Sequence, residues 1–128
     1  MINIKLGVIP TRRDIFSKEE ALKYKELILQ KLATMNITFV DIEDANDEGL
    51  LFDDNDVDKV VDKMIKEKVD ALFFPHCNFG TEYLVAQVAK KMNLPILIWG
   101  PRDESPLGDG SRLRDSQCGL FATGKVLR

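Results

Sequence analysis

One histidine stands out among the residues that could carry chemistry. His76, the only histidine in the chain, directly follows Pro75 and the apolar run 71–74. An unperturbed histidine changes its charge near neutral pH, so it can polarise a hydroxyl or carbonyl group or accept a proton. A hydrogen-bonded loop histidine without a catalytic duty is an equally good interpretation. A metal site on His76 is not expected, because there is no second histidine and Cys77 is too close along the chain.

Two arginines follow the first apolar run of the chain. Arg12 and Arg13 come just after Pro10, which ends that run. A guanidinium at this position can bind a phosphate with two parallel hydrogen bonds or pair with the hydroxyls of a polyol. The alternative is a solvated loop pair that bonds to Asp14 or to the acidic segment 43–55.

Three further groups near the expected loops could contact a ligand. Thr81 opens a helical pattern whose free amides suit an electron-rich oxygen, although it is more often just an N-cap. Glu82 lies in the first turn, where a carboxylate suits the helix dipole. Trp99 ends an apolar run and could stack on a ligand, but a tryptophan at the end of a parallel strand is more often part of the core.

Strand and helix patterns alternate along the whole chain. Ser17 and Glu20 form a capping-box pair that opens the first helix, and Val57, Val60, Val61, Met64 and Ile65 have the spacing of an amphipathic helix. The expected strands are residues 2–9, 37–42, 71–74 and 96–99, and the expected helices begin near residues 17, 56, 81 and 115.

The alternation predicts an α/β fold with a parallel sheet, because a helical crossover returns the chain in the same direction. Right-handed crossovers favour a three-layer, doubly wound, flavodoxin-like (Rossmann-like) sheet with the strand order 2-1-3-4. The loops after the four strands then share one edge, where ligands bind in such sheets. The first and third loops, with Arg12, Arg13 and His76, are expected to lie closest together.

Size and charge narrow the class of protein. A chain of 128 residues fits one α/β domain over residues 1–128, and a formal charge of −3 argues against a nucleic-acid binder. No signal peptide or membrane-spanning run is recognisable, so we expect a cytoplasmic protein that does not bind membranes. Cys77 and Cys118 are expected to be free thiols.

Two segments are less regular. The acidic connection 43–55 surrounds a short apolar insert, and we expect it to be mobile because its charges repel one another. Residues 101–128 read as a loop with two prolines and two glycines, followed by the start of a helix. That helix lacks a glycine cap at Arg128, so we expect the chain to be part of a larger protein, although a natural C-terminal helix that frays into solvent is the alternative.

Several stretches, in this order and spacing, resemble one family. They are LGVIP at 6–10 with the arginine pair, NFGTE at 78–82, LP at 94–95 with IWG at 98–100 and Asp103, DGSRL at 109–113, and CGLFAT at 118–123. Together they are similar to the N-terminal domain of the L-fucose/L-arabinose isomerase family, and the resemblance covers essentially the whole chain. PHCNF at 75–79 departs from the loop of fucose isomerases, which tends to be richer in cysteine and tryptophan, so the particular sugar stays open.

The resemblance implies a manganese-dependent ketol isomerase that interconverts aldoses and ketoses. The Mn²⁺ ligands and the catalytic carboxylates are expected in later domains, so this chain alone should be inactive, with no catalytic or metal-binding residue of its own. Its role would be to shape the sugar pocket and to contribute contacts in a homo-oligomer. The residues expected to bind the sugar are Arg12, Arg13, His76, Asn78, Phe79, Thr81, Glu82 and Trp99.

Two alternatives from other classes remain open. The chain could be a stand-alone binding module for a sugar or a small anion, which a reading frame ending at Arg128 would favour. It could also serve assembly, with the loops at the edge of the sheet buried between subunits. In that case, substitution of His76 or Arg13 would change the oligomer mass rather than the affinity for a ligand.

Overall fold

Four parallel strands form the centre of the molecule. The computed structural model describes residues 3–128. The strands β1 (Lys5–Val8), β2 (Thr38–Val40), β3 (Ala71–Pro75) and β4 (Ile96–Trp99) lie in the order β2-β1-β3-β4. All three pairings are parallel, with Leu6 opposite Ala71 and Leu72 opposite Ile96. The predicted α/β fold and strand order are therefore confirmed.

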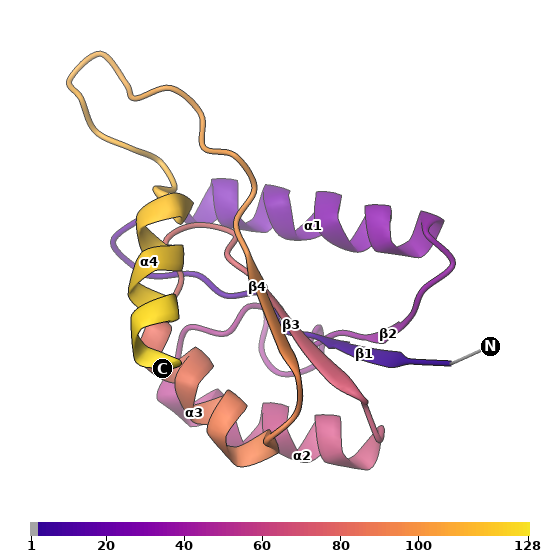
Figure 1. Ribbon diagram of the computed structural model, residues 1–128. Helices are drawn as coiled ribbons and strands as arrows, with labels where there is room; N and C mark the ends of the chain where they lie inside the picture. Colours follow the sequence, from indigo (N-terminus) through magenta and orange to yellow (C-terminus); the bar gives the residue numbers. More distant parts are fainter. Residues whose placement is uncertain (1–2) are drawn as a thin grey trace.

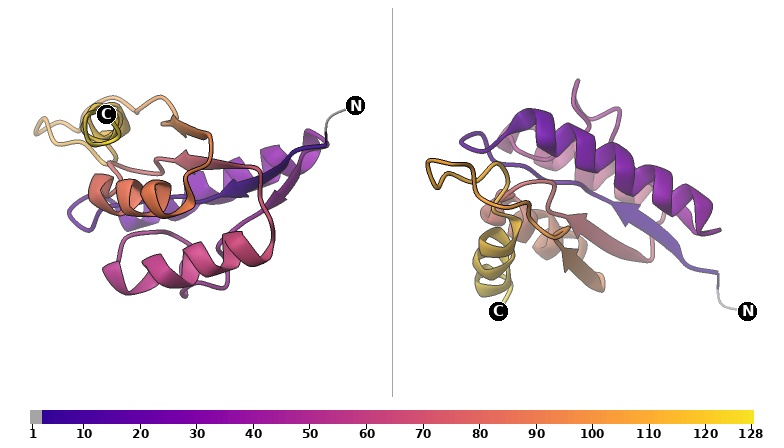
Figure 2. Two further views of the ribbon diagram at one scale, coloured as in Figure 1. Left: turned by 60° about the horizontal axis from the view of Figure 1, so that its bottom comes forward. Right: turned by 90° about the horizontal axis from the view of Figure 1, so that it is seen from above.

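Helices cover the sheet on both faces, which gives three layers (Figures 1 and 2). On one face, α1 (Lys18–Thr34) packs Ile28 and Leu32 toward Phe73 of β3. On the other face, α2 (Val57–Lys66) and α3 (Glu82–Met92) bury apolar side chains such as Met64 and Leu84. The last helix, α4 (Ser116–Val126), lies beside α3 and near β4.

Local signals in the sequence explain where the helices begin and end. The Ser17 hydroxyl accepts a hydrogen bond from the Glu20 amide at 3.1 Å, as the capping-box pattern predicts. Asn93 closes α3 in the left-handed conformation that asparagine tolerates. The short helix Asp54–Asp56 (η1) is capped by Asp53 and leads directly into α2.

Two strands are shorter than their apolar runs predict. The first was predicted over residues 2–9 and spans Lys5–Val8, and residue 2 lies outside the described residues. Ile9 still donates its amide to the Phe73 carbonyl at 2.8 Å. The second, predicted over 37–42, is Thr38–Val40, because β2 is an edge strand that pairs on one side with only three residues of β1.

The acidic connection 43–55 is held more firmly than the mobility predicted for it. Leu50 and Leu51 are fully buried, one in the core on each face of the sheet. Lys25 of α1, itself buried, bonds to the Glu43 carboxylate and to the Glu48 carbonyl. The predicted mobility rested on repulsion between the acidic side chains, but basic side chains lie among them and offset that repulsion.

Candidate functional site

The loops after β1 and β3 meet at the carboxyl edge of the sheet, as predicted. Thr11 lies between them and forms parallel bridges to Leu51 on one side and His76 on the other. Its buried hydroxyl donates to the Leu51 carbonyl at 2.8 Å and accepts from the Thr81 amide at 3.1 Å. Sequence reasoning gave Thr11 no role; its place directly after a strand that ends in proline is the available signal.

Asn78 fixes the shape of both loops. Its side-chain oxygen accepts hydrogen bonds from the amides of Arg13 (2.7 Å) and Gly80 (3.2 Å). Its side-chain nitrogen donates to the carbonyls of Arg13 and Ser17. Because both ends of the Asn78 amide are used inside the protein, this residue positions the backbone on which Arg13 is mounted.

Thr81 has a similar internal role. Its hydroxyl donates to the Arg12 carbonyl at 2.7 Å and makes no capping bond to α3. The preceding Gly80 has φ +80°, and a Cβ atom there would lie 2.6 Å from the His76 ring. Only glycine fits this turn, which brings the start of α3 against the loop after β1.

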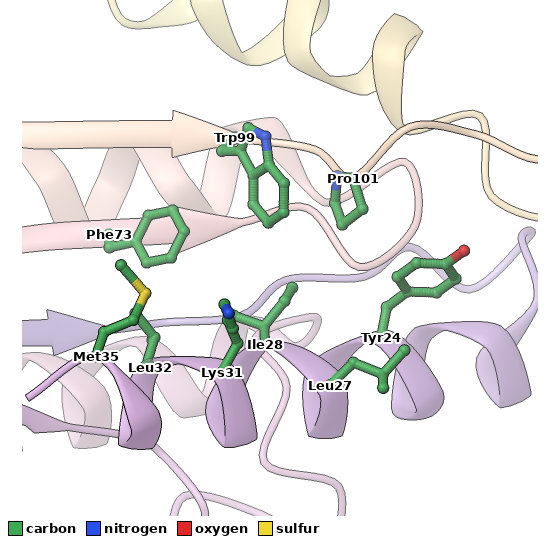
Figure 3. A pocket seen from close by; sticks show the side chains of 9 residues that line it. All are labelled: Tyr24, Leu27, Ile28, Lys31, Leu32, Met35, Phe73, Trp99 and Pro101. Atoms are coloured by element: carbon green, nitrogen blue, oxygen red, sulfur yellow. The ribbon is translucent and has the colours of Figure 1, made fainter.

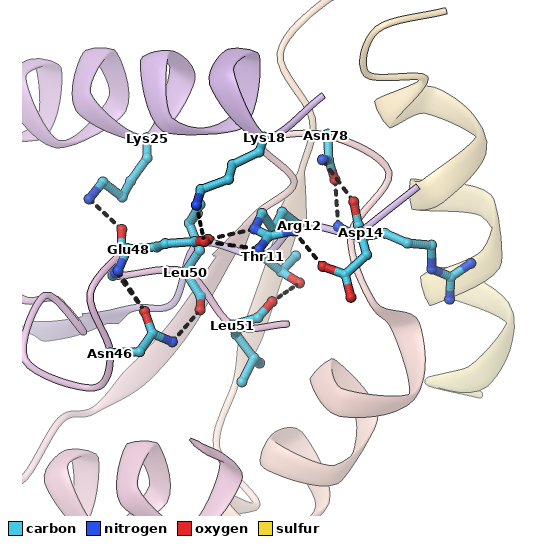
Figure 4. Close-up of polar contacts among 12 residues, drawn as sticks. Thr11, Arg12, Asp14, Lys18, Lys25, Asn46, Glu48, Leu50, Leu51 and Asn78 are labelled. Atoms are coloured by element: carbon cyan, nitrogen blue, oxygen red, sulfur yellow. Dashed lines mark hydrogen bonds and ion pairs between the residues drawn. The ribbon is translucent and has the colours of Figure 1, made fainter. Parts of the chain in front are cut away.

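The two arginines have different surroundings. Arg12 is buried, and its Nε and Nη2 atoms bind the two oxygens of Glu48 at 2.6 and 3.0 Å (Figure 4). Its Nη1 donates to Asp14, and its guanidinium lies 3.8 Å from the centre of the Phe52 ring. Burial lowers the pKa of Arg12, but the bonds to Glu48 and Asp14 outweigh it and the net shift is upward. This guanidinium is therefore committed to partners inside the protein.

Glu48 is the partner that sequence analysis did not identify. Burial raises the pKa of its carboxyl, but hydrogen bonds from Arg12 and Lys18 outweigh that effect and the pKa falls below its usual value. Lys18 reaches it at 2.9 Å from the start of α1. Glu48 thereby ties the acidic connection to the loop after β1.

Arg13 points toward the outside of the same edge. It forms an ion pair with Glu82 of α3, and its guanidinium lies 5.0 Å from the centre of the Phe79 ring. The Phe79 ring in turn stacks on Phe16 at 5.1 Å. The Arg13 and Glu82 side chains are 26% and 23% exposed, so both are open to a molecule from solvent. We call Arg13, Phe16, Phe79 and Glu82 the rim cluster.

His76 is fully buried beneath this edge. Its Nδ1 lies 3.1 Å from the Phe74 carbonyl, which can only accept, so Nδ1 carries the proton. Nε2 then accepts from the Thr123 hydroxyl of α4 at 2.8 Å. Burial lowers the pKa of His76 to about 4. The ring is thus neutral at physiological pH and holds α4 against the loop after β3.

This environment predicts that the free energy of unfolding decreases as the pH is lowered through a window set by His76. The unfolded histidine binds a proton near its ordinary pKa of 6.5, whereas the folded one resists protonation down to about 4. The unfolded state therefore binds more protons, and we expect to lose about 2 kcal/mol of stability between about pH 7 and about pH 5. Urea denaturation at a series of pH values measures this loss.

A variant without the titrating ring provides the control. His76→Gln should be less stable at neutral pH but should show a nearly flat profile in the same window. Carboxyls with lowered pKa values, such as Asp103, lose their stabilising contribution only as the pH falls below about 4.5, which is outside this window. An equal slope in both proteins would contradict the assignment.

Trp99 and the loop after β4 complete this edge of the sheet, and the Leu113 carbonyl of that loop accepts a hydrogen bond from the Ser17 amide, next to Phe16. Trp99 packs against Phe73 on the face that α1 covers, with ring centroids 6.4 Å apart. Asp103 caps α4 by accepting from the Ser116 and Gln117 amides. The buried Arg114, which sequence reasoning did not single out, binds Glu104 at 3.0 Å.

The described residues offer little basis for metal binding or for thiol chemistry. Within residues 3–128, no three His, Cys, Asp or Glu side chains are grouped so that they could hold a metal ion. Cys77 is buried and Cys118 exposed, and both are free, as predicted. Burial raises the pKa of the Cys77 thiol to about 12, so it stays protonated. No helix in the described part of the chain is long and apolar enough to cross a membrane.

The fold and its polar edge define a doubly wound α/β domain with its loops gathered at the carboxyl ends of the strands. Comparison with family models identifies it further: residues 7–128 match the N-terminal domain of fucose/sulfoquinovose isomerases. The match covers nearly the whole chain, which therefore belongs to this family. Neither a curated protein nor a solved structure matches significantly.

Proposed function

We propose that this domain binds the sugar for a cytoplasmic aldose–ketose isomerase whose catalytic groups lie in other domains. The family supports an isomerase, and the rim cluster is the observation that supports a role in sugar binding. Sugar sites combine an aromatic ring with a few polar groups that fix orientation. The rim cluster has both on the edge where doubly wound sheets bind their ligands.

Each member of the rim cluster has a distinct task in this proposal. Arg13 donates hydrogen bonds to sugar oxygens, and the Glu82 carboxylate accepts them from sugar hydroxyls. The Phe79 ring, supported by Phe16, packs against the C–H face of the sugar. Since Arg13 and Glu82 already pair with each other, their charges are balanced before the sugar arrives. Arg12, Asn78, Thr81 and His76 hold the loops in place beneath them.

The chemical step is assigned to the rest of the enzyme. In the family that the sequence resembles, a divalent metal ion holds neighbouring substrate oxygens while a proton moves between adjacent carbons. The residues described here do not fit such a metal, because no three suitable ligands lie together. We therefore propose that Mn²⁺ and the proton-transferring carboxylates belong to later domains, and that the sheet edge adjoins the pocket within a homo-oligomer.

Substitution of Arg13 tests the proposal. The complete gene product, prepared with Mn²⁺, would be assayed for aldose–ketose exchange on a panel of pentoses and deoxyhexoses. Arg13→Met is expected to lower kcat/KM by about 10- to 100-fold, the loss of one or two hydrogen bonds from a charged group. Arg13→Lys, which keeps one charged donor, should retain part of that activity.

The same series separates the rival functions. A change of oligomer mass in Arg13→Met, with kcat/KM per active oligomer unchanged, would favour an assembly role. A gene that ends at Arg128 would remove the isomerase proposal and favour a small binding module, for which sugar titration of the isolated chain replaces the assay. Unchanged mass and unchanged kcat/KM would overturn the assignment of Arg13 to the sugar.

A further inference from the structure

The cations of the loop after β1 and of the start of α1 are all bound to carboxylates. Three cations and three carboxylates meet there: Arg12, Arg13, Lys18, Asp14, Glu48 and Glu82. Arg13 binds Glu82, whereas the other two cations are both bound to Glu48. The charges at this edge of the sheet are therefore balanced within the protein, before a ligand arrives.

The backbone amides of the adjoining turn are committed in the same way. Free amides at a helix N-terminus can bind an anion, and doubly wound sheets place such amides at this edge. Here the Gly80 amide donates to the Asn78 side-chain oxygen at 3.2 Å, and the Thr81 amide donates to the Thr11 hydroxyl at 3.1 Å. The Arg13 amide donates to the same Asn78 oxygen at 2.7 Å. These three amides are therefore not available to an anion.

Glu82 is the acidic member of the rim cluster, and two features stabilise its charge. Arg13 pairs with it, and its place in the first turn of α3 puts it at the positive end of the helix dipole. An anionic group on a sugar would have to take Arg13 from this carboxylate or lie beside it. Both arrangements are unfavourable, because like charges placed together reject a wrong partner.

A neutral sugar meets no such repulsion at the same place. Its hydroxyls can donate to the Glu82 carboxylate and accept from the Arg13 guanidinium without separating the two charges. We propose that the rim cluster selects uncharged sugars over those with a sulfonate, phosphate or carboxylate group, and that Glu82 sets this preference. The inference rests on the proposed function, since it concerns which sugars the same site accepts.

Membership of the family leaves this choice open. The family comprises isomerases of fucose, which is a neutral sugar, and of sulfoquinovose, which carries a sulfonate. The charge balance around Arg13 and Glu82 is the observation that favours the neutral kind for this chain.

The loop after β4 brings further arginines to this edge of the sheet. Arg102 and Arg112 are both exposed, so either could hold an anion in place of Arg13. Trp99 adds no charge, since it lines an almost wholly apolar groove with Phe73 on the α1 face (Figure 3). The test must therefore separate an anion held by Arg13 from one held by the other two arginines.

Two matched pairs of sugars test the preference: L-fucose with its 6-sulfonate, and quinovose with sulfoquinovose. The members of each pair differ only by the sulfonate. We expect the complete gene product to bind the neutral member at least about tenfold more tightly, as one unfavourable charge contact requires. Calorimetric titration gives the dissociation constants without relying on turnover, and kcat/KM with Mn²⁺ gives the same ratio for sugars that react.

Glu82→Gln removes the negative charge but keeps the length of the side chain and its acceptor oxygen. Arg13 is then free to meet the sulfonate, so the preference for the neutral member should fall by about tenfold or reverse. Glu20→Gln is the matched control, because it removes a carboxylate from the first turn of α1 instead, and it should leave the preference intact.

Double variants show which arginine holds the sulfonate. Adding Arg13→Met to Glu82→Gln should abolish the gained affinity for the sulfonated sugars. Adding Arg102→Met or Arg112→Met instead should leave that gain in place, and a loss there would overturn the assignment to the rim cluster.

The inference and the proposed function fail in different ways. Equal or tighter binding of the sulfonated members by the unaltered protein, binding of neither pair, or an unchanged preference in Glu82→Gln would overturn the inference. A loss of kcat/KM for neutral sugars in Arg13→Met would still support the sugar site in that case. An unchanged kcat/KM in Arg13→Met would remove the sugar site, and this inference with it.

Discussion

Arg12→Met is expected to lower the free energy of unfolding by about 3 to 5 kcal/mol. The change removes one partner of a buried ion pair that is held by two hydrogen bonds, and it leaves the Glu48 carboxylate without its main counter-charge. The methionine keeps an apolar stem beside Phe52, so the loss reports the charge more than the packing. Urea denaturation followed by circular dichroism at neutral pH measures it.

The adjacent arginine gives the matched control. Arg13→Met removes an ion pair whose two side chains are about one quarter exposed, and solvent screens such a pair, so a loss of no more than about 1 kcal/mol is expected. The two substitutions should thus have different effects, on stability for Arg12→Met and on sugar kinetics for Arg13→Met. Equal losses of stability in both variants would show that the burial of Arg12 does not set the cost.

The fold could be predicted from the sequence because its local signals agree. Apolar runs alternate with helix periods, Ser17 and Asn93 mark helix ends, and short crossovers leave few topologies. The same reasoning placed the arginine pair and His76 on one edge, where the structure has them. Strand lengths were predicted less well, since pairing partners rather than apolar runs decide where a ladder ends.

The roles of individual residues at that edge could not be predicted in the same way. Nothing local distinguishes Arg12 from Arg13, because the difference comes from Glu48, 36 positions away in a connection expected to be loose. Thr11 was overlooked for the same reason, since its partner Leu51 lies 40 positions away. Arg114 was overlooked because the Tyr24 ring on which its guanidinium lies is distant in sequence. Whether Trp99 contacts the sugar remains a prediction, and the structure places it in a groove on the α1 face.

Gly119→Ala is expected to cost at least about 3 kcal/mol, although alanine is the better helix former. A Cβ atom at position 119 would lie 1.7 Å from the Phe79 carbonyl oxygen and 2.6 Å from its carbon. Backbone atoms cannot swing aside as a side chain can, so either α4 or the loop after β3 must move. Overpacking usually costs about 1 to 3 kcal/mol, and this contact belongs at or above the upper end.

Gly124→Ala, in the same helix, is the control. No atom lies within 4 Å of the Cβ that it would add, so only helix propensity changes and the helix should gain up to about 1 kcal/mol. The opposite signs of the two variants can be measured by urea denaturation. A gain in both would mean that α4 is not docked on the loop.

Under the proposed function, the displacement also connects α4 with the sugar site. Phe79 is part of the rim cluster, so a shift of its backbone should disturb the ring that Arg13 and Phe16 contact. At a temperature where Gly119→Ala remains folded, we expect sugar kinetics to weaken as in Arg13→Met, whereas Gly124→Ala should leave them unchanged. Normal kinetics in a folded Gly119→Ala protein would contradict either the displacement of Phe79 or its contact with the sugar.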